Sequence, residues 1–561
     1  MPRPLLMGLE TEYAVTAFVG EGRSEAGGLV ERFISTASNL RPFVVDGLGS
    51  PRGIFLSNGA RFYVDAGLHP EYATPECSTP REVVAHVRAG DRLLLEVADD
   101  IAQHARRSRS SANASASATI PALDELAVFR CNVAYDDPPS TWGSHSSYLH
   151  RENPRAFPDR LIPHLVSRIV YSGAGGFIPT SSGTEFTLSP RVWMLEQVIS
   201  SESTQARGIY HTKNETLSKE GYHRLHVLCG DSVCSDLALL LRVGTTALVV
   251  ATIDGGGMES SDVQLAAPLE AMRAIARDVE CRTRVALVSG DCVSAIDLQR
   301  RYLSKVNAYR RRGGLPDWAG EICTLWEEVL EQLEEGSPTL ETRLDWPMKY
   351  ALYRRWAGCD DWSRLARYGA IHAHVRRRLL AAVGKGGGQQ RRFDLELLIG
   401  EQSPVPDEVA RLERYLHARD ADWDGLRACL KLRAELLEID VRFGQLGPRG
   451  IHEQLQAAHP ATTPLIDPED VARAAVAPPP VGRAKVRGDL VKSIHHSGGG
   501  TSHGCAWSRV WNARDGSYAD LSDPFETEAR WSTARVDEDV PPRLRDLQLD
   551  MTPFFLRGQR A

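Results

Sequence analysis

Alternating polar and apolar residues predict β-strands in the first third of the chain, whereas from about residue 325 the pattern changes to that of long charged helices. Residues 61–65 alternate polar with apolar side chains, as a half-buried strand does. Residues 9–15 are also predicted to form a strand, and further strands are expected over residues 129–133 and 146–149. Strands therefore dominate the beginning of the chain.

The segment after Cys77 predicts a helix that carries its own start signal. Thr79 can cap this helix, Pro80 suits the first helical position, and Glu82 completes a capping box. Apolar residues then recur at helical spacing, at positions 83, 84, 87, 93, 94 and 97. A second helix is expected over residues 161–170, a buried apolar stretch over 237–251, and long charged helices from about residue 325.

Breaks in these patterns suggest how the chain is divided. At 561 residues it is long enough for two or three structural units. Residues 106–118 are polar and of low complexity, which is typical of an exposed loop. The glycine tract at 384–390 is typical of a flexible connector, and three prolines at 478–480 mark another boundary.

Composition narrows the class of protein. With 42% hydrophobic and 25% charged residues, the chain has the mix of a folded globular protein. A net charge of −7 argues against a nucleic-acid partner. The start of the chain has too short an apolar stretch for a signal peptide, and no uninterrupted apolar run of about 18 residues follows, so no membrane is expected. None of the ten cysteines forms a C-x-x-C pair, so we expect reduced thiols in a cytoplasmic protein.

Two glutamates near the start of the chain are the first candidates for chemistry. Glu10 and Glu12 are two residues apart on a predicted strand, so their carboxylates point to the same face. Like charges so placed repel unless a cation or an arginine compensates them. Adjacent carboxylates suit Mg²⁺, which takes hard oxygen ligands and keeps substrate phosphates in its shell. The alternative is a solvated strand edge with two exposed glutamates.

A second group of polar residues favours the metal interpretation. Arg61, Tyr63 and Asp65 share one face of the next predicted strand. The planar guanidinium of an arginine suits phosphate, and an aspartate beside metal-bound phosphate can take a proton from an attacking amine. Glu71 and Glu76 add carboxylates within a few residues. A set of this size is hard to explain as unrelated surface residues.

These segments carry a family resemblance. Gly8-Leu-Glu-Thr-Glu-Tyr13, Asn58-Gly-Ala-Arg-Phe-Tyr-Val-Asp65 and His69-Pro-Glu-Tyr-Ala-Thr-Pro-Glu-Cys77 resemble the Pup ligase and Pup deamidase family, within the glutamine-synthetase-like carboxylate–amine ligases. The resemblance continues in an ordered series of later segments: 143–145, 165–168, 223–227, 230–232, 244–249, 345–349 and 478–488.

The resemblance implies an α+β fold, with a glutamine-synthetase-like curved antiparallel β-sheet cradle packed by helices and a small C-terminal domain. We expect a catalytic domain over residues 1–357, a helical insertion over 358–430, a return to catalytic-domain helices over 431–475, and the C-terminal domain over 476–561. The basic residues of the insertion, at 376–378 and 391–392, either dock an acidic partner or lie on a solvated helix face.

The resemblance also implies ATP and Mg²⁺ as cofactors. In the ligase, the γ-carboxylate of a terminal glutamate on Pup is phosphorylated, and a protein lysine then attacks the acyl phosphate. The partners would be a small Pup-like protein modifier and protein lysine acceptors. Carried over by motif, the metal ligands would be Glu10, Glu12, Tyr63, Glu71 and His226. The catalytic base would be Asp65. The residues contacting ATP would be Arg61, Thr74, His145, Arg224 and Trp507.

Two segments depart from the family pattern. Where the family has Gly-x-His-Glu-Asn-Tyr, this chain has Gly143-Ser-His-Ser-Ser-Tyr148, and residues 212–219 replace an arginine, an aspartate and a histidine of the family motif. The short connection between Glu12 and Asn58 favours the ligase branch. The alternatives are a phosphotransferase acting on a non-Pup substrate, a deamidase-like hydrolase, and a catalytically inactive nucleotide-binding partner protein.

Overall fold

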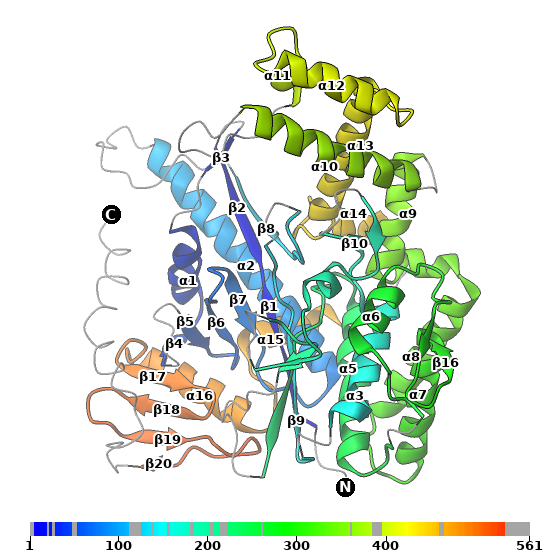
Figure 1. The fold of residues 1–561 in the computed structure, drawn as a ribbon. Coiled ribbons are helices and arrows are strands. Elements are labelled where there is room, and N and C mark those ends of the chain that lie inside the picture. Colours follow the sequence, from blue (N-terminus) through cyan, green and yellow to red (C-terminus); the bar gives the residue numbers. More distant parts are fainter. Residues whose placement is uncertain are drawn as a thin grey trace.

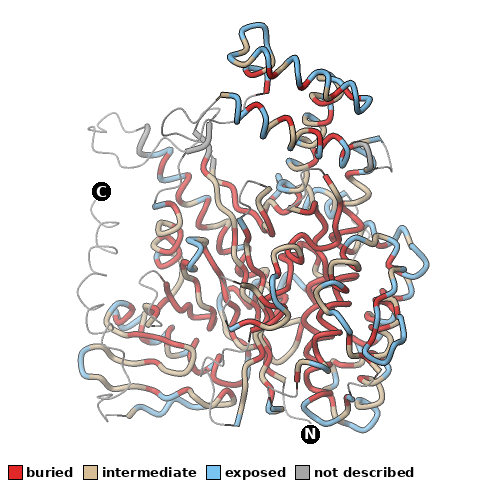
Figure 2. The backbone as a smooth tube through the Cα atoms, in the orientation of Figure 1, coloured by how far each residue is buried: buried red, intermediate tan, exposed pale blue. Residues whose placement is uncertain are grey.

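A curved, many-stranded β-sheet runs through the middle of the molecule, with helices packed against it and a helical projection at one end (Figure 1). The computed structural model describes residues 5–19, 22–24, 28–47, 53–110, 125–135, 140–153, 157–179, 184–201, 206–211, 221–259, 262–358, 362–383, 395–458 and 465–532. Buried residues are concentrated along the sheet and the helices beside it (Figure 2).

The main sheet has 13 strands in the order β12-β13-β14-β9-β1-β7-β6-β5-β4-β17-β18-β19-β20. All neighbouring strands are antiparallel except the pairs β12–β13 and β4–β17. The strands are β1 (Met7–Glu12), β4 (Phe43–Asp46), β5 (Gly53–Leu56), β6 (Arg61–Val64), β7 (Pro70–Ala73), β9 (Ser146–His150), β12 (Ile199–Ser200), β13 (Tyr210–His211), β14 (His223–Val227), β17 (His503–Ala506), β18 (Arg509–Asn512), β19 (Tyr518–Asp520) and β20 (Trp531–Ser532). The predicted α+β fold with a curved, largely antiparallel sheet is confirmed.

Three small sheets accompany the main one. They are formed by β2 (Ala14–Val19), β3 (Gly22–Ser24) and β8 (Glu125–Phe129); by β10 (Gly176–Phe177) and β11 (Phe186–Thr187); and by β15 (Arg284–Ala286) and β16 (Cys292–Ser294). The strand expected over residues 129–133 is wrong, because β8 ends at Phe129. Beyond it, Asn132 leaves the strand path and exchanges two hydrogen bonds with Ser232. The strand expected over residues 9–15 is divided at Tyr13 into β1 and β2.

The helix predicted after Cys77 is confirmed as α2 (Pro80–Ser110), which crosses one face of the sheet (Figure 1). The capping box is present, because the Thr79 hydroxyl accepts a hydrogen bond from the Glu82 N–H at 3.1 Å and the Glu82 carboxylate accepts one from the Thr79 N–H at 3.2 Å. The loop expected from residue 106 is wrong up to Ser110, since the helix continues to that point. The rest of that expected loop, residues 111–118, lies outside the described residues.

A layer of helices covers the other end of the sheet. It contains α3 (Pro158–Ser167), α4 (Ile169–Ser172), α5 (Asp236–Asp254), α6 (Pro268–Ala276), α7 (Ala295–Arg311), α8 (Ala319–Glu335) and α9 (Asp345–Ala357), together with the short 3₁₀ helices η1 (Pro190–Met194) and η2 (Pro338–Thr342). The expected helix over 161–170 is thus two helices that meet at Arg168. The predicted buried apolar stretch is confirmed as α5. Among the described residues, α5 alone has the length and apolar composition to cross a membrane, yet 89% of its most apolar window is buried inside the fold.

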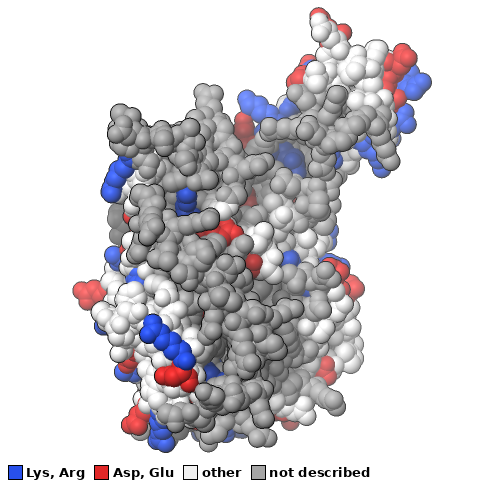
Figure 3. Space-filling model, turned by 90° about the vertical axis from the view of Figure 1, so that its left-hand side faces the viewer, with Lys and Arg blue, Asp and Glu red and all other residues white. Residues whose placement is uncertain are grey.

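The region expected as a helical insertion projects from the body (Figure 1). It contains α10 (Ser363–Val383), α11 (Leu395–Ile399), α12 (Pro406–His417) and the first part of α13 (Trp423–Phe443), which returns to the body. Figure 3 shows basic and acidic side chains interspersed over this projection. Of the basic residues noted in the sequence, Arg378 is paired with Glu408 at 2.6 Å, and residues 391–392 lie outside the described residues.

The end of the described chain joins the main sheet. After α14 (Ile451–Ala458) and α15 (Pro468–Val476), helix α16 (Arg483–His496) packs against β4 and β5, and β17 pairs in parallel with β4. The remaining helix, α1 (Leu29–Leu40), lies beside α2. The proposed domain boundaries remain a prediction, but strands β17 to β20 extend the sheet that carries the motifs of the N-terminal segment.

Candidate active site

Strands β1, β7 and β6 bring the predicted carboxylates together. Buried and part-exposed residues alternate along β1, so Glu10 and Glu12 face the same side of the sheet while Leu9 and Thr11 are buried on the other. In the register of the strands, Glu12 lies opposite Glu71 on β7. Glu71 is in turn opposite Tyr63 on β6. Three carboxylates and a phenol therefore share one patch of the sheet.

Strands β9 and β14 bring basic groups to the other side of Glu10. Its carboxylate lies 2.7 Å from the Arg224 guanidinium, 3.6 Å from His145 Nδ1 and 3.3 Å from His226 Nε2. The two imidazoles contact each other edge to face, with ring centres 5.3 Å apart. Arg224 also donates a hydrogen bond from Nε to the Ser147 hydroxyl at 3.0 Å, so one of the two serines that depart from the family motif helps to orient this arginine.

The charges around this patch shift the carboxylates in opposite directions. Burial alone would raise the pKa of Glu10, but the neighbouring His226 and Arg224 lower it well below its usual value. Burial together with the charges of Glu10 and Glu12 raises the pKa of Glu71 well above its usual value. The crowded carboxylates therefore favour either a proton on Glu71 or a bound cation.

The donor atoms fit a divalent cation. Glu10, His145 and His226 offer ligand atoms within 4.8 Å of one another, and so do Glu12, Glu71 and His145. His226 Nε2 is buried and lies 3.3 Å from the Glu10 carboxylate, so the two groups are placed to bind one cation together. Carboxylate oxygens are the ligands that Mg²⁺ prefers. The assignment of individual ligands remains a prediction.

Asp65 lies in the tight turn that joins β6 to β7. Its Oδ1 accepts a hydrogen bond from the His69 backbone N–H at 2.6 Å, and its Oδ2 lies 3.4 Å from His69 Nδ1. The same His69 nitrogen is 3.2 Å from Glu12 Oε2. Burial alone would lower the pKa of His69, but the two carboxylates raise it to about 9. Burial would likewise raise the pKa of Glu12, yet the hydrogen bond from His69 and nearby positive charges hold it at about 2.

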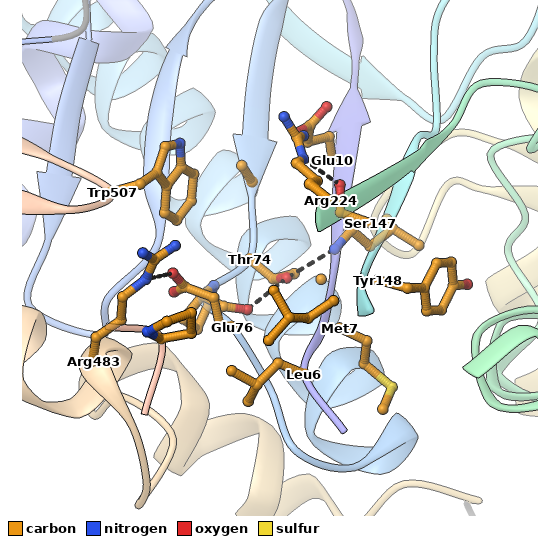
Figure 4. Close-up of a pocket in the computed structure, with 16 residues that line it drawn as sticks. Leu6, Met7, Glu10, Thr74, Glu76, Ser147, Tyr148, Arg224, Arg483 and Trp507 are labelled. Atoms are coloured by element: carbon orange, nitrogen blue, oxygen red, sulfur yellow. Dashed lines mark hydrogen bonds and ion pairs between the residues drawn. The ribbon is translucent and has the colours of Figure 1, made fainter. Parts of the chain in front are cut away.

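A pocket opens beside Glu10 and extends toward the C-terminal strands (Figure 4). It encloses about 640 Å³, counting its open mouth, and Glu10, Arg224, Thr74 and Trp507 are among its lining residues. The Thr74 hydroxyl accepts a hydrogen bond from the Leu9 backbone N–H at 3.0 Å. Four of the residues predicted to contact the metal or ATP therefore meet at one cavity.

Trp507 reaches the pocket from the turn between β17 and β18. Its ring meets Phe55 edge to face at 5.1 Å, and the Arg487 guanidinium lies over it at 4.8 Å from the ring centre. Arg487 also donates to the Trp507 carbonyl at 3.0 Å. The tryptophan is thereby fixed as one wall of the cavity.

Arg61 lies outside the pocket, because its side chain is directed toward strand β4. Its guanidinium donates to Asp46 Oδ2 on β4 at 2.6 and 2.9 Å and covers the Tyr63 ring at 3.7 Å. Arg61 is not among the residues that line the pocket. Its predicted contact with ATP therefore remains a prediction, and a phosphate would have to compete with Asp46 for its donors.

Sequence reasoning noted Glu76 only as an additional carboxylate and gave no role to the two arginines that attach the C-terminal unit to the site. Glu76 is paired with Arg483 at 2.6 Å and with Arg487. Both arginines lie in the 478–488 segment that carries part of the family resemblance. Their place in this segment was the sequence feature that could have identified them. Asp46 gave no signal beyond its residue type, and His69 lies in the 69–77 motif, but its position between two carboxylates was not predicted. Residues 212–219, the second departure from the family, lie outside the described residues.

The fold and the clustered carboxylates fit an ATP-dependent carboxylate–amine ligase, and this is the class that the relatives of the chain indicate. The family model described as Pup-ligase protein matches residues 5–370 and 410–511. The chain is 31% identical over 546 residues to the Pup–protein ligase of Micrococcus luteus, covering 95% of this chain and 97% of the relative. It is 32% identical over 421 residues to the Pup–protein ligase of Sanguibacter keddieii, covering 72% and 87% of the two chains. This protein belongs to the Pup-ligase family, and the resemblance found in its motifs is confirmed.

Solved structures agree with this assignment at the level of the fold. One is the complex between the Prokaryotic Ubiquitin-like Protein Pup and its ligase PafA, with a TM-score of 0.68, 22% identity, and coverage of 100% of this chain and 95% of that one. Another is PafA in complex with ADP, with a TM-score of 0.61, 22% identity and coverage of 95% of both chains. The family model skips residues 371–409, which lie within the helical projection.

Proposed function

We propose that this protein is a Pup–protein ligase, which uses ATP to join the terminal glutamate of a Pup-like modifier to lysines of other proteins. The observation that carries the proposal is the position of Glu10. This residue belongs to the carboxylate and histidine cluster and also lines the pocket that Trp507 closes. Relatives of nearly the same length that are named Pup–protein ligases support the same reaction.

ATP and Mg²⁺ are the cofactors that this arrangement suits. The pocket offers an aromatic wall at Trp507 and a cation at Arg224, and the PafA relative of similar fold is known as an ADP complex. Glu10, Glu12, Glu71 and His226 would hold Mg²⁺, with Tyr63 beside them. When bound, Mg²⁺ would neutralise charge on the phosphates and orient the phosphoryl group.

The chain's own residues would then act in two steps. In the first, the modifier's γ-carboxylate attacks the γ-phosphorus of ATP, which yields an acyl phosphate and ADP, and Arg224 is placed to neutralise negative charge in the pocket. In the second, a lysine amine attacks the acyl carbon and inorganic phosphate leaves. Asp65 would take the proton that the amine loses, because its carboxylate borders the cluster and is held in place by the β6–β7 turn.

We place this reaction in the cytoplasm. Every cysteine in the described part of the chain is a free thiol, and most are buried, which fits a reducing compartment.

The test combines ADP release with intact-mass measurement, using purified protein, ATP, Mg²⁺, a Pup-like protein ending in glutamate and a lysine-bearing acceptor. A mass gain of one modifier, coupled to ADP release, is expected. ADP release without that adduct would favour a phosphotransferase with another substrate, and release of the modifier from an existing conjugate would favour the hydrolase. Absence of turnover would favour a nucleotide-binding protein and overturn the proposal.

The role of Asp65 is tested by changing the nucleophile. Asp65→Asn should lose ligation to lysine, whose amine is protonated at neutral pH and needs a base. The same variant should still release hydroxamate when hydroxylamine, which is uncharged at neutral pH, traps the acyl phosphate. Full lysine ligation by Asp65→Asn would contradict its assignment as the base.

A further inference from the structure

We propose that His69 is a positioning residue that fixes Asp65 and Glu12 relative to each other for transfer of the amine. The inference rests on the proposed function, in which Asp65 is the base and Glu12 belongs to the metal cluster. His145 and His226 have been given roles at the metal and ATP, but His69, which lies between these two carboxylates, has not.

The geometry of the turn places His69 over Asp65. The Asp65 backbone N–H donates to the His69 carbonyl at 3.0 Å, and the His69 backbone N–H returns a hydrogen bond to Asp65 Oδ1 at 2.6 Å. Between them, Leu68 has a left-handed backbone with φ of 64° although it is not a glycine, and its side chain is exposed. Strain of this kind persists where the surrounding structure holds it and is typical of functional sites.

Close contacts show that the imidazole is held in one place. A Cβ at Gly67 would lie 2.8 Å from His69 Cε1 and 3.0 Å from Asp65 Oδ2, so a side chain there would displace both groups. On its other side, the His69 ring lies against the Trp142 ring, with centres 5.1 Å apart and planes inclined by 36°. The ring is thus packed between the turn and Trp142, with Nδ1 directed at the two carboxylates.

The two carboxylates come from separate segments that His69 links. Glu12 ends β1, whereas Asp65 lies beyond β6, and the Nδ1 atom is 3.2 Å from one and 3.4 Å from the other. All three side chains are largely buried, with exposed fractions of 12%, 14% and 19% for Glu12, Asp65 and His69. Without the imidazole, the Asp65 side chain would keep, among the contacts of the described residues, only the backbone hydrogen bond on one oxygen. Its other oxygen would then be free to rotate away from the amine.

Displacing a catalytic group by about 1 Å costs roughly 100-fold in rate. His69→Phe keeps an aromatic ring against Trp142 but removes the link between the carboxylates. We expect this variant to lower kcat for lysine ligation by about 100-fold, with an unchanged KM for ATP. At saturating Mg²⁺, trapping of the acyl phosphate by hydroxylamine should fall far less, because that step does not need the base. His69→Asn, which keeps a hydrogen-bond donor, should recover part of the lysine activity.

A double-mutant cycle separates positioning from a general structural effect. If His69 acts through Asp65, adding His69→Phe to Asp65→Asn should cause no further loss of lysine ligation. His104→Phe is the matched control, because His104 is an exposed histidine on α2, and it should leave all activities unchanged. Thermal unfolding of each variant reports whether the fold is retained, and His69→Asn decides the question if His69→Phe does not fold.

Two results would overturn the inference. One is wild-type kcat for lysine in His69→Phe, and the other is an equal loss of lysine ligation and hydroxylamine trapping. Failure of the proposed function gives a different result, namely no modifier–lysine product from the wild type, whereas full lysine ligation by Asp65→Asn would refute the assignment of Asp65 as the base.

Discussion

Glu76→Gln should loosen the attachment of α16 and the C-terminal strands to the active site. Glu76 follows β7 on the motif-bearing segment and accepts hydrogen bonds from Arg483 and Arg487 on α16. Arg487 also holds Trp507, so this ion-pair cluster connects the sheet, α16 and the wall of the pocket. Figure 4 shows Glu76 and Arg483 of this cluster beside Trp507. Glutamine preserves the shape of the side chain, but it removes the charge and replaces one acceptor oxygen with an NH2 donor.

The magnitude follows from burial and charge. The side chains of Arg483 and Arg487 are 5% and 0% exposed, and removing one partner from a buried ion pair typically costs about 3–5 kcal/mol. Burial alone would raise the pKa of Glu76, but the two arginines lower it from 4.5 to about 2. A drop of this size corresponds to about 3 kcal/mol of stabilisation at pH 7. The loss expected for a buried ion pair and the stabilisation that corresponds to the pKa shift therefore have the same size.

The pKa also fixes how the effect depends on pH. Because the folded-state pKa is the lower one, the stabilisation is fully present above pH 4.5 and is lost as the pH falls toward 2. Urea unfolding at pH 7 should therefore show a loss of about 3 kcal/mol in Glu76→Gln, and the difference from the wild type should shrink below pH 4.5. Hydrogen exchange should show the loss in α16 and β17, and the KM for ATP should rise as Trp507 loses its support.

The matched control is Glu321→Gln, which breaks an ion pair with Arg81 whose side chains are 39% and 41% exposed. Exposed pairs contribute less than about 1 kcal/mol, so this variant should be close to the wild type. The reasoning fails if Glu76→Gln is no less stable than Glu321→Gln at pH 7, or if its deficit persists unchanged at pH 3.

Two further predictions concern close packing and the helical projection. Gly143→Ala would place a Cβ 2.6 Å from Glu12 Oε1 and 2.7 Å from His145 Nε2. Because this Cβ would displace both side chains, we expect roughly 100-fold lower ATP turnover with little change in thermal stability. Retained ATP turnover would refute this prediction. Asp440 accepts hydrogen bonds from Lys349 at 2.8 Å, from the buried Tyr353 and from the partly buried Tyr135, so Asp440→Asn should destabilise the base of α13 by about 3–5 kcal/mol. Limited proteolysis should then cut the projection sooner than in the wild type, and an unchanged cleavage rate would contradict this role.

The same contacts explain some motifs that sequence resemblance left without a role. Lys349 and Asp345 both belong to the 345–349 segment, and their side chains hold the structure together, since Asp345 accepts hydrogen bonds from the backbone N–H groups of Cys234 and Ser235. Tyr13, at the end of the first motif, donates to the buried Asp91 at 2.8 Å. A motif therefore contains residues that support the site as well as residues that form it.

Local sequence was enough to predict the elements whose signals are local. The alternation in β6 and the capping box of α2 depend on neighbouring residues, and both were confirmed. Prediction failed where side chains took the backbone out of a regular element. Asn132 exchanges hydrogen bonds with Ser232, 100 residues away, so β8 ends earlier than its apolar pattern suggested.

The sequence by itself determined the family and the residue types of the site, because both lie in short motifs such as those around Glu10 and Asp65. Only the tertiary structure decided which groups meet. Arg224 reaches Glu10 from 214 residues away because β14 and β9 pair beside β1, and Trp507 reaches the pocket because β17 pairs with β4. Strand pairing depends on the register of the whole sheet, and the spacing of residues within any one segment does not contain that information.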